Sequence, residues 1–282
     1  MKNIFNKKRG ELTTQQIVGL IILITSFAVI LFFFFRLNLG EETQKEICHN
    51  SVVLAGKGTL SKIATGGGSL DCRTSYVCIS GGGKCEGINP TETKKINMNP
   101  KLVKDKSKDD LIKEQVMKAI ADEMVDCWWM FGEGKIDYIG GTSFTGEKSC
   151  SICSMVVFDK NIENQEISYN YFYNYLRTTK KDNSKTYLNY LFGVDDVDGL
   201  GKGYLSNEFD FSKEYFISTA LGKESVFESY WTIPGLSIKT IKYFTKDGKE
   251  IDSKVGALPP TILEAKKENY KKIDCNEFIT KA

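Results

Sequence analysis

The strongest hydrophobic pattern in the chain is a continuous apolar run near the N-terminus. Residues 17–35 are nineteen positions without a charged side chain, and Arg36 ends the run. At 1.5 Å per residue, a helix of this length spans roughly 28 Å, close to the hydrocarbon thickness of a bilayer. A cleaved secretory signal would have a shorter apolar region followed by small residues. The run therefore predicts a retained transmembrane anchor over residues 15–36, in contact with membrane lipid through residues 17–35.

The charges on either side of this run predict the orientation of the anchor. The basic residues that precede it are Lys2, Lys7, Lys8 and Arg9. Arg36 follows it, and then come Glu41 and Glu42. The more basic flank of a membrane helix stays in the cytoplasm. We therefore expect residues 1–14 to be a cytoplasmic basic segment and the bulk of the chain to be extracytoplasmic.

Beyond the anchor, the sequence predicts two further parts. Residues 41–53 contain few helix breakers, so the helix is expected to continue outward as a stalk over residues 37–55. Residues 56–282 then form the extracytoplasmic domain. Its first part, residues 56–106, is punctuated by glycine runs and has few large apolar side chains, so crosslinks would have to supply the order that a core supplies elsewhere.

The clearest helix after the anchor covers residues 109–131. Ser107 can cap its start, two aspartates suit the positive end of the helix dipole, and Gly132 and Gly134 can end it. The apolar positions recur at steps of three and four, and they are Ile112, Val116, Ile120, Met124, Cys127, Trp128 and Phe131. We expect Trp128 and Trp129 to belong to the core, with a ligand platform as the alternative.

Other segments indicate a mixture of strands and helices. Strand patterns occur at residues 73–79, 154–158, 215–218 and 237–245. Alternating tyrosines in residues 169–176 fit a strand or a short aromatic helix, and residues 187–192 pose the same choice. Such an aromatic surface could bind glycans or partners, although core packing is the favoured role. The sequence predicts a mixed α+β fold, stabilised by disulfides and without βαβ repetition.

The cysteines predict the compartment of the domain. All eight follow the anchor, and they are Cys48, Cys72, Cys78, Cys85, Cys127, Cys150, Cys153 and Cys275. An even number on the exported side favours structural disulfides, whose pairing the sequence does not determine. Two alternatives are a redox-active C-x-x-C pair and a zinc site built from Cys72, Cys78, Cys150 and Cys153. A strand-like sequence follows the C-x-x-C, and the C-x5-C spacing fits no common zinc motif, so both are disfavoured.

Charge and composition exclude several classes of function. The 282-residue chain has a net charge of +2, but residues 37–282 hold 33 basic and 35 acidic side chains, so no basic face for nucleic acid is expected. His49 is the single histidine, which excludes HExxH metalloproteases. The chain also lacks a Walker A, a GxSxG and a strand-linked GxGxxG motif. We therefore expect no catalytic residue and no cofactor.

One acidic turn is a weak candidate for a metal site. Asp195, Asp196 and Asp198 precede Gly199, an arrangement that offers oxygen ligands in a turn, as calcium loops do. The EF-hand spacing fails, because Val194 would hold its first position and Leu205 its last. A solvated acidic turn is the favoured interpretation, so no metal is expected.

The N-terminus resembles archaeal type IV pilin-like (class III) signal sequences. The resemblance lies in the basic residues before Gly10 and the polar start at Glu11, followed by the apolar helix. It implies cleavage between Gly10 and Glu11 by a prepilin peptidase. That class has a glutamate at the fifth position of the mature chain, where this sequence has Gln15.

The rest of the chain resembles a group of uncharacterised, membrane-anchored archaeal proteins. The similarity lies in the segments around Cys48-His49-Asn50, Leu70-Asp71-Cys72, Asp126-Cys127-Trp128-Trp129 and Cys150-Ser151-Ile152-Cys153. Two hypotheses follow. The first is a non-enzymatic surface protein with a structural or interaction role, which associates with proteins or with itself and is pilin-like at its N-terminus. The alternative is an anchored extracytoplasmic enzyme, either a carboxylate-based hydrolase or a thiol-disulfide oxidoreductase.

Overall fold

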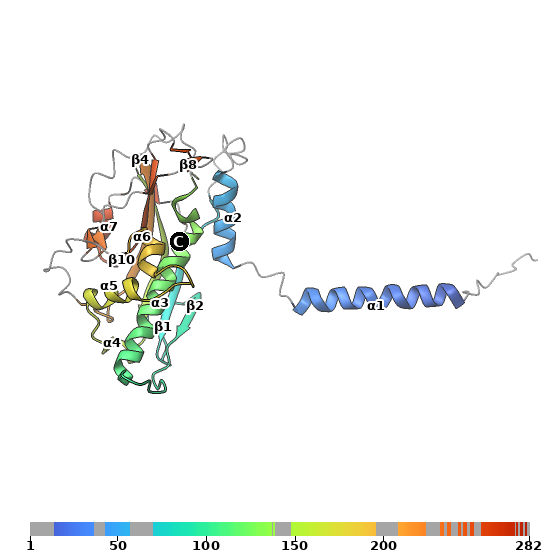
Figure 1. Cartoon of the computed structure of the whole chain (residues 1–282), viewed down its shortest axis with the longest axis horizontal. Coiled ribbons are helices and arrows are strands. Elements are labelled where there is room, and N and C mark those ends of the chain that lie inside the picture. Colours follow the sequence, from blue (N-terminus) through green and yellow to red (C-terminus); the bar gives the residue numbers. More distant parts are fainter. Residues whose placement is uncertain are drawn as a thin grey trace, which may run out of the picture. The chain divides into compact units, whose positions relative to one another are not determined.

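The computed structural model describes the chain in two units, Met1–Thr43 and Gln44–Ala282 (Figure 1). In the first unit it describes residues 14–36 and 43. The described residues of the second unit are 44–56, 70–136, 138, 148–195, 208–223, 232–233, 236–237, 242–243, 245–246, 249–250, 255–273, 275, 277–278 and 280.

The first unit contains a single described helix, α1 (Thr14–Arg36). The side chains of residues 15–32 are exposed, and most of them are aliphatic or aromatic. Thr25 and Ser26 are polar, but their hydroxyls donate to the carbonyls of Ile21 and Ile22 at 2.9 and 2.6 Å. These hydroxyls are therefore satisfied within the helix and need no water to hydrogen-bond. In the part of the chain that the structure describes, α1 is the one helix that is long and apolar enough to cross a membrane.

A mixed sheet organises the second unit. Its described strands follow the order β2-β1-β3-β4-β10-β7, and β11 also pairs with β3. Parallel pairing joins β1 to β2 and β3, while β4 is antiparallel to both β3 and β10. The strands are β1 (Ser75–Ser80), β2 (Glu92–Lys95), β3 (Lys148–Phe158), β4 (Tyr215–Lys223), β7 (Lys242–Tyr243), β10 (Val255–Glu264) and β11 (Glu277–Phe278). Two short hairpins stand apart, β5 (Thr232–Ile233) with β6 (Leu236–Ser237) and β8 (Thr245–Lys246) with β9 (Lys249–Glu250).

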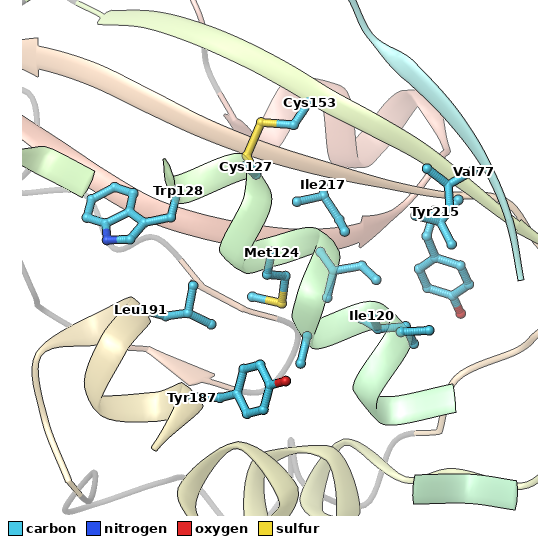
Figure 2. Close-up of a cluster of buried hydrophobic side chains, with 14 of the residues drawn as sticks. Val77, Ile120, Met124, Cys127, Trp128, Cys153, Tyr187, Leu191, Tyr215 and Ile217 are labelled. Atoms are coloured by element: carbon cyan, nitrogen blue, oxygen red, sulfur yellow. A yellow bond between two sulfur atoms is a disulfide. The ribbon is translucent and has the colours of Figure 1, made fainter. Parts of the chain in front are cut away.

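Helices cover both faces of this sheet. Those outside α1 are α2 (Gln44–Gly56), α3 (Lys108–Met130), α4 (Lys160–Glu163), α5 (Tyr169–Thr178), α6 (Tyr187–Phe192) and α7 (Lys267–Ile273), together with the 3-10 turn η2 (Gly132–Gly134). The main core lies between the sheet and α3, and Figure 2 shows Met124 of α3 between Leu191 of α6 and Ile217 of β4. On the opposite face, Tyr270 of α7 stacks on Phe216 with ring centroids 4.5 Å apart. The mixed α+β fold predicted from the sequence is confirmed.

Local sequence explains the ends of α3. The Ser107 hydroxyl accepts the N–H of Asp110 at 3.1 Å, and the Asp110 carboxylate accepts the N–H of Ser107 in return, so two free donors are satisfied. At the other end, Gly132 has a φ of +76°, and a Cβ there would lie 2.6 Å from the side chain of Ile136. Ser107 therefore caps α3 and Gly132 ends it as predicted, and the helix bounds, Lys108–Met130, lie one residue earlier than the predicted 109–131.

The segment expected to form a stalk over residues 37–55 is helical from Gln44, as α2. This helix belongs to the folded unit, because Cys48 and Val52 are buried in the main core and Cys48 pairs with Cys72. The compact unit accordingly starts at Gln44 and not at residue 56. The helix packs here because apolar side chains four positions apart share one face, which faces α3.

Both aromatic segments left open by the sequence are helices. In α5 the buried side chains are Phe172, Tyr173 and Leu176, with the spacing of one helix face. Ser168 caps α5, and its hydroxyl accepts the N–H of Tyr171 at 3.1 Å. Thr186 caps α6 in the same way. Tyrosines therefore contribute to the core and also to the surface of this layer.

Candidate functional site

The eight cysteines form four pairs at disulfide distance, and none is free. The pairs are Cys48–Cys72, Cys78–Cys85, Cys127–Cys153 and Cys150–Cys275. They connect α2 to the segment before β1, the end of β1 to its following loop, α3 to β3, and β3 to the C-terminal segment. The pairing could not be deduced from the sequence, because eight cysteines permit about a hundred arrangements.

The C-x-x-C segment lies within β3 and not at the start of a helix. Cys150 packs with Phe216 on one face of the sheet, whereas Cys153 packs in the main core on the other. The pairing of β3 with β4 shifts register between Ile152 and Ser154, so Cys153 is the extra residue of a bulge. Each sulfur is bonded to a distant cysteine, so the geometry favours a structural role over a redox pair or a zinc site.

The two adjacent tryptophans have different surroundings. Trp128 is 1% exposed and lies in the main core (Figure 2). Trp129 is half-buried and stacks on His49, with ring centroids 4.0 Å apart and planes 14° apart. The His49 Nδ1 also lies 2.8 Å from the Trp129 carbonyl oxygen. The pair therefore does not form a joint ligand platform, because one ring is inside and the other is covered by a side chain of α2.

A buried ion-pair network connects α2, β2 and α3. Glu123 of α3 is 1% exposed, and its carboxylate lies 2.8 Å from the Lys45 ammonium and 2.7 Å from that of Lys94. Lys45 also contacts Asp126 at 2.7 Å and Glu92 at 3.0 Å. Five charged residues from three separate segments of the chain thus converge, and no sequence motif marks them.

The ion pairs of this network favour the charged forms of Lys45, Lys94 and Glu92. Burial alone would lower the pKa of Lys45 and of Lys94, but the Glu123 carboxylate, and for Lys45 also the Asp126 carboxylate, outweigh it and raise both pKa values above the ordinary one. Burial opposes ionisation of Glu92 as well, yet the hydrogen bond from Lys45 leaves its pKa lowered. The network joins two ammonium groups to three carboxylates and keeps one net negative charge, and the pairing of its charges with one another indicates a structural role.

Tyrosines of α6 pair with carboxylates of α3 and η2. The Tyr187 hydroxyl donates to Asp122 at 2.6 Å, and the Tyr190 hydroxyl donates to Glu133. Burial and these acceptors raise the pKa of both phenols. Lys181 lies over the Tyr190 ring, 4.1 Å from its centroid. These hydroxyls are proton donors to carboxylates, and their raised pKa values make them poor catalytic bases near neutral pH.

Glycines in the loop after β1 accommodate a buried carboxylate. Asp159, at the end of β3, accepts the Gly83 N–H at 2.6 Å and the Ser80 hydroxyl at 3.0 Å. A Cβ at Gly83 would lie 2.7 Å from the same carboxylate oxygen, so a side chain there would disturb the contact. Asp159 also caps α4 by accepting the N–H groups of Asn161 and Ile162. The Asp159 carboxylate thus accepts hydrogen bonds that hold the loop and cap α4.

The candidate binding site is an open groove of about 460 Å³ along the first turns of α3. The segment before α3 forms one wall, and the end of α5 forms the other. Among the described lining residues are Lys101, Lys106, Lys118, Glu114, Gln115 and Tyr175, and none is a histidine, cysteine or serine. The wall offers three ammonium groups against one carboxylate, which suits an anionic or hydroxyl-rich partner and supplies no activated nucleophile.

The lysines of the groove differ in their partners. Lys106 pairs with Glu114, and Lys118 pairs with Asp122 at 2.6 Å. Lys101 has no carboxylate partner among the residues that the structure describes. A basic excess therefore remains at the wall that carries Lys101. The sequence signal that could have found it is the lysine-rich stretch 101–108.

The remaining sequence candidates carry no site in the described chain. Asp195 accepts a hydrogen bond from the Asn189 amide at 2.8 Å, while Asp196 and Asp198 lie outside the described residues. Gly10 and Glu11, the expected cleavage position, also lie outside them. Within the described residues, no group of three histidine, cysteine or acidic side chains could hold a metal ion. Comparison with protein-family models, curated proteins and solved structures finds no match.

Proposed function

We propose that the chain is a single-pass membrane-anchored protein whose folded unit is an extracytoplasmic interaction module, with the lysine-lined groove as its binding surface. The observation that carries this proposal is the complete pairing of eight cysteines, all of which follow the apolar helix. Disulfides persist in oxidising compartments and are rare in the cytoplasm. An exported, covalently crosslinked unit that follows a helix of membrane-spanning length is the arrangement of an anchored surface protein.

Binding fits the chemistry of the groove better than catalysis does. Its described lining contains lysines, amides and a tyrosine, which donate hydrogen bonds to anions and hydroxyls. The phenols nearby have raised pKa values, and the one histidine of the chain is stacked against Trp129. A structural or interaction role follows from these features, with protein or self-association at the cell surface as its expected form.

We further propose that α1 remains a membrane anchor and does not become the core of a pilin-like filament. Cleavage before Glu11 would place a new amine in an apolar setting, where an unpaired charge is costly. The residue at the fifth position from that cut is Gln15, which has no charge to neutralise the amine. N-terminal sequencing of membrane-purified protein separates the cases, since an intact start supports the anchor and a start at Glu11 in sheared filaments contradicts it.

The topology is tested with reporter fusions to the full chain after Ala282. A reporter that works only outside the cytoplasm should be active, and one that works only inside should be silent. A matched fusion at the N-terminus should give the opposite pattern. Activity of the cytoplasmic reporter at the C-terminus would refute the extracytoplasmic placement, and extraction of the chain by alkaline carbonate would refute the anchor.

A further inference from the structure

The segment before α3 forms a tight turn whose tip is both apolar and basic. Val103 and Lys106 pair across the turn, the Lys106 N–H donates to the Val103 carbonyl at 3.1 Å, and Asp105 has a φ of +69°. Leu102, just before the bridge, is 72% exposed, and Val103, the first bridge residue, is 55% exposed; together with the turn residues Lys104 and Asp105 they make residues 102–105, which we call the tip. We call residues 100–108 the basic hairpin. Outside α1, the exposed large hydrophobic residues that the structure describes are these two and Leu54.

Four lysines lie close in sequence to the two exposed aliphatic side chains. The basic hairpin contains Lys101, Lys104, Lys106 and Lys108 and one acid, Asp105. Lys106 pairs with Glu114, and Lys108 donates to Asn99 at 3.0 Å. Lys101 and Lys104 have no carboxylate partner in the described part of the chain, although they are exposed next to the tip and within it. Two exposed aliphatic side chains with four exposed lysines close in sequence are complementary to an anionic lipid surface, which offers both phosphates and a hydrocarbon boundary.

The direction of the hairpin also fits a membrane partner. Lys45 contacts Glu123 and Asp126, and His49 stacks on Trp129, so α2 and α3 run in the same direction (Figure 1). The hairpin precedes α3, and the fifteen residues from Lys108 to Glu123 rise about 22 Å along the helix. The hairpin therefore extends beyond the start of α2, toward the end of the unit where the chain enters.

The length of the chain before α2 limits how far the start of α2 can lie from a membrane. Seven residues, 37–43, separate α1 from α2, and fully extended they span at most about 25 Å. If α1 spans the bilayer, the start of α2 stays within about that distance of the surface. That distance is similar to the roughly 22 Å by which the hairpin extends beyond the start of α2.

We propose that the basic hairpin docks on the anionic lipid surface next to the anchor, with Leu102 and Val103 at the acyl boundary and Lys101 and Lys104 at the headgroups. This inference rests on the proposed function, because the anchor is what keeps the hairpin near lipid.

The test uses the full chain in nanodiscs whose lipids carry bromine near the headgroup end of the acyl chains. The variant Leu102→Trp places an indole at the tip, and its fluorescence is taken as the difference from the unsubstituted chain. We expect a loss of this added fluorescence in discs that contain phosphatidylglycerol, compared with the same discs made without bromine. The loss should be smaller in discs of phosphatidylcholine alone and should diminish at 1 M salt, where the Debye length is about 3 Å.

Two further variants make the test specific. Leu54→Trp places an indole at the other exposed aliphatic site, near the end of α2, and should show no loss. Leu102→Trp combined with Lys101→Gln and Lys104→Gln should lose less fluorescence than Leu102→Trp alone. Absence of alkylation without reductant verifies that each variant keeps its cysteine pairs.

The outcomes separate this inference from the function on which it rests. If the chain enters the discs and the added indole is not quenched, the hairpin is free or binds a protein, and lipid docking is refuted while the anchor stands. Equal quenching at Leu54→Trp also refutes it, because contact would then be unspecific. A chain that does not enter the discs refutes the anchor and the docking together.

Discussion

Replacing Glu123 by glutamine should destabilise the folded unit by about 3 kcal/mol. Glutamine preserves the size of the side chain but removes the negative charge that lies between Lys45 and Lys94. Removal of one partner from a buried ion pair costs about 3–5 kcal/mol. We expect the lower end of that range, because Lys45 keeps Asp126 at 2.7 Å and Glu92 at 3.0 Å, and both lysines retain some solvent contact.

Urea unfolding of the oxidised chain in detergent measures this change through the free energy of unfolding at constant slope. For a unit of this size, about 3 kcal/mol corresponds to a fall in melting temperature of roughly 6–12 °C. The matched control is Lys118→Gln, which removes an exposed pair with Asp122 four residues along α3. That change should cost no more than about 0.5 kcal/mol.

Two results would refute the reasoning about Glu123. A loss below about 1 kcal/mol would mean that the carboxylate is hydrated and contributes as surface pairs do. A loss that disappears at 1 M salt would lead to the same conclusion, since screening weakens exposed pairs far more than buried ones.

Three further predictions follow from the core, the cysteines and the titrating groups. Trp128→Ala should lower the free energy of unfolding by roughly 3–5 kcal/mol in the same urea assay, because the ring is fully buried, and an unchanged midpoint would show that it is not. Mass spectrometry after alkylation should find no label without reductant and eight labels after reduction and unfolding, and removal of the Cys127–Cys153 pair by two serines should cost about 2–4 kcal/mol. The pKa values of Lys45 and Tyr187 are raised above their ordinary 10.5 and 10.0, so the folded state binds these protons more tightly than the unfolded chain. Stability from both groups is therefore complete at neutral pH and should fall as pH rises above about 10; a melting temperature that stays constant through that range would contradict this.

Elements with strong local signals could be predicted from the sequence. The α3 helix was identifiable because its apolar spacing, its Ser107 cap and its stop at Gly132 all agree. The strand after Cys153 was identifiable from its β-branched residues. The α5 and α6 helices were not, because tyrosine and phenylalanine occupy buried and half-buried positions alike, so their alternation conceals the helical spacing of Phe172, Tyr173 and Leu176.

Features that depend on long-range contacts could not be predicted. The α2 helix has a short apolar face, and only its contacts with α3 and the Cys48–Cys72 pair make it part of the folded unit. Glu123 is a charged residue on a helix that the sequence otherwise predicts well, and its burial is explained only by the ion pairs with Lys45 and Lys94. The groove likewise needs α5 to be placed against α3. These facts arise from tertiary packing, which a single sequence does not encode in any local pattern.

The position of the first cysteine pair has a mechanical consequence when tension is applied to the folded unit from its N-terminal side. Tension enters the folded unit at Gln44 and meets the Cys48–Cys72 bond four residues later. The covalent bond diverts the load past everything between those two cysteines and delivers it to the chain just before β1. That strand lies between β2 and β3, and it is parallel to both, so force along its axis must shear two rows of hydrogen bonds together. Shearing two rows of hydrogen bonds needs more force than peeling a strand from a sheet edge. The unit should therefore extend little under load while its disulfides are intact.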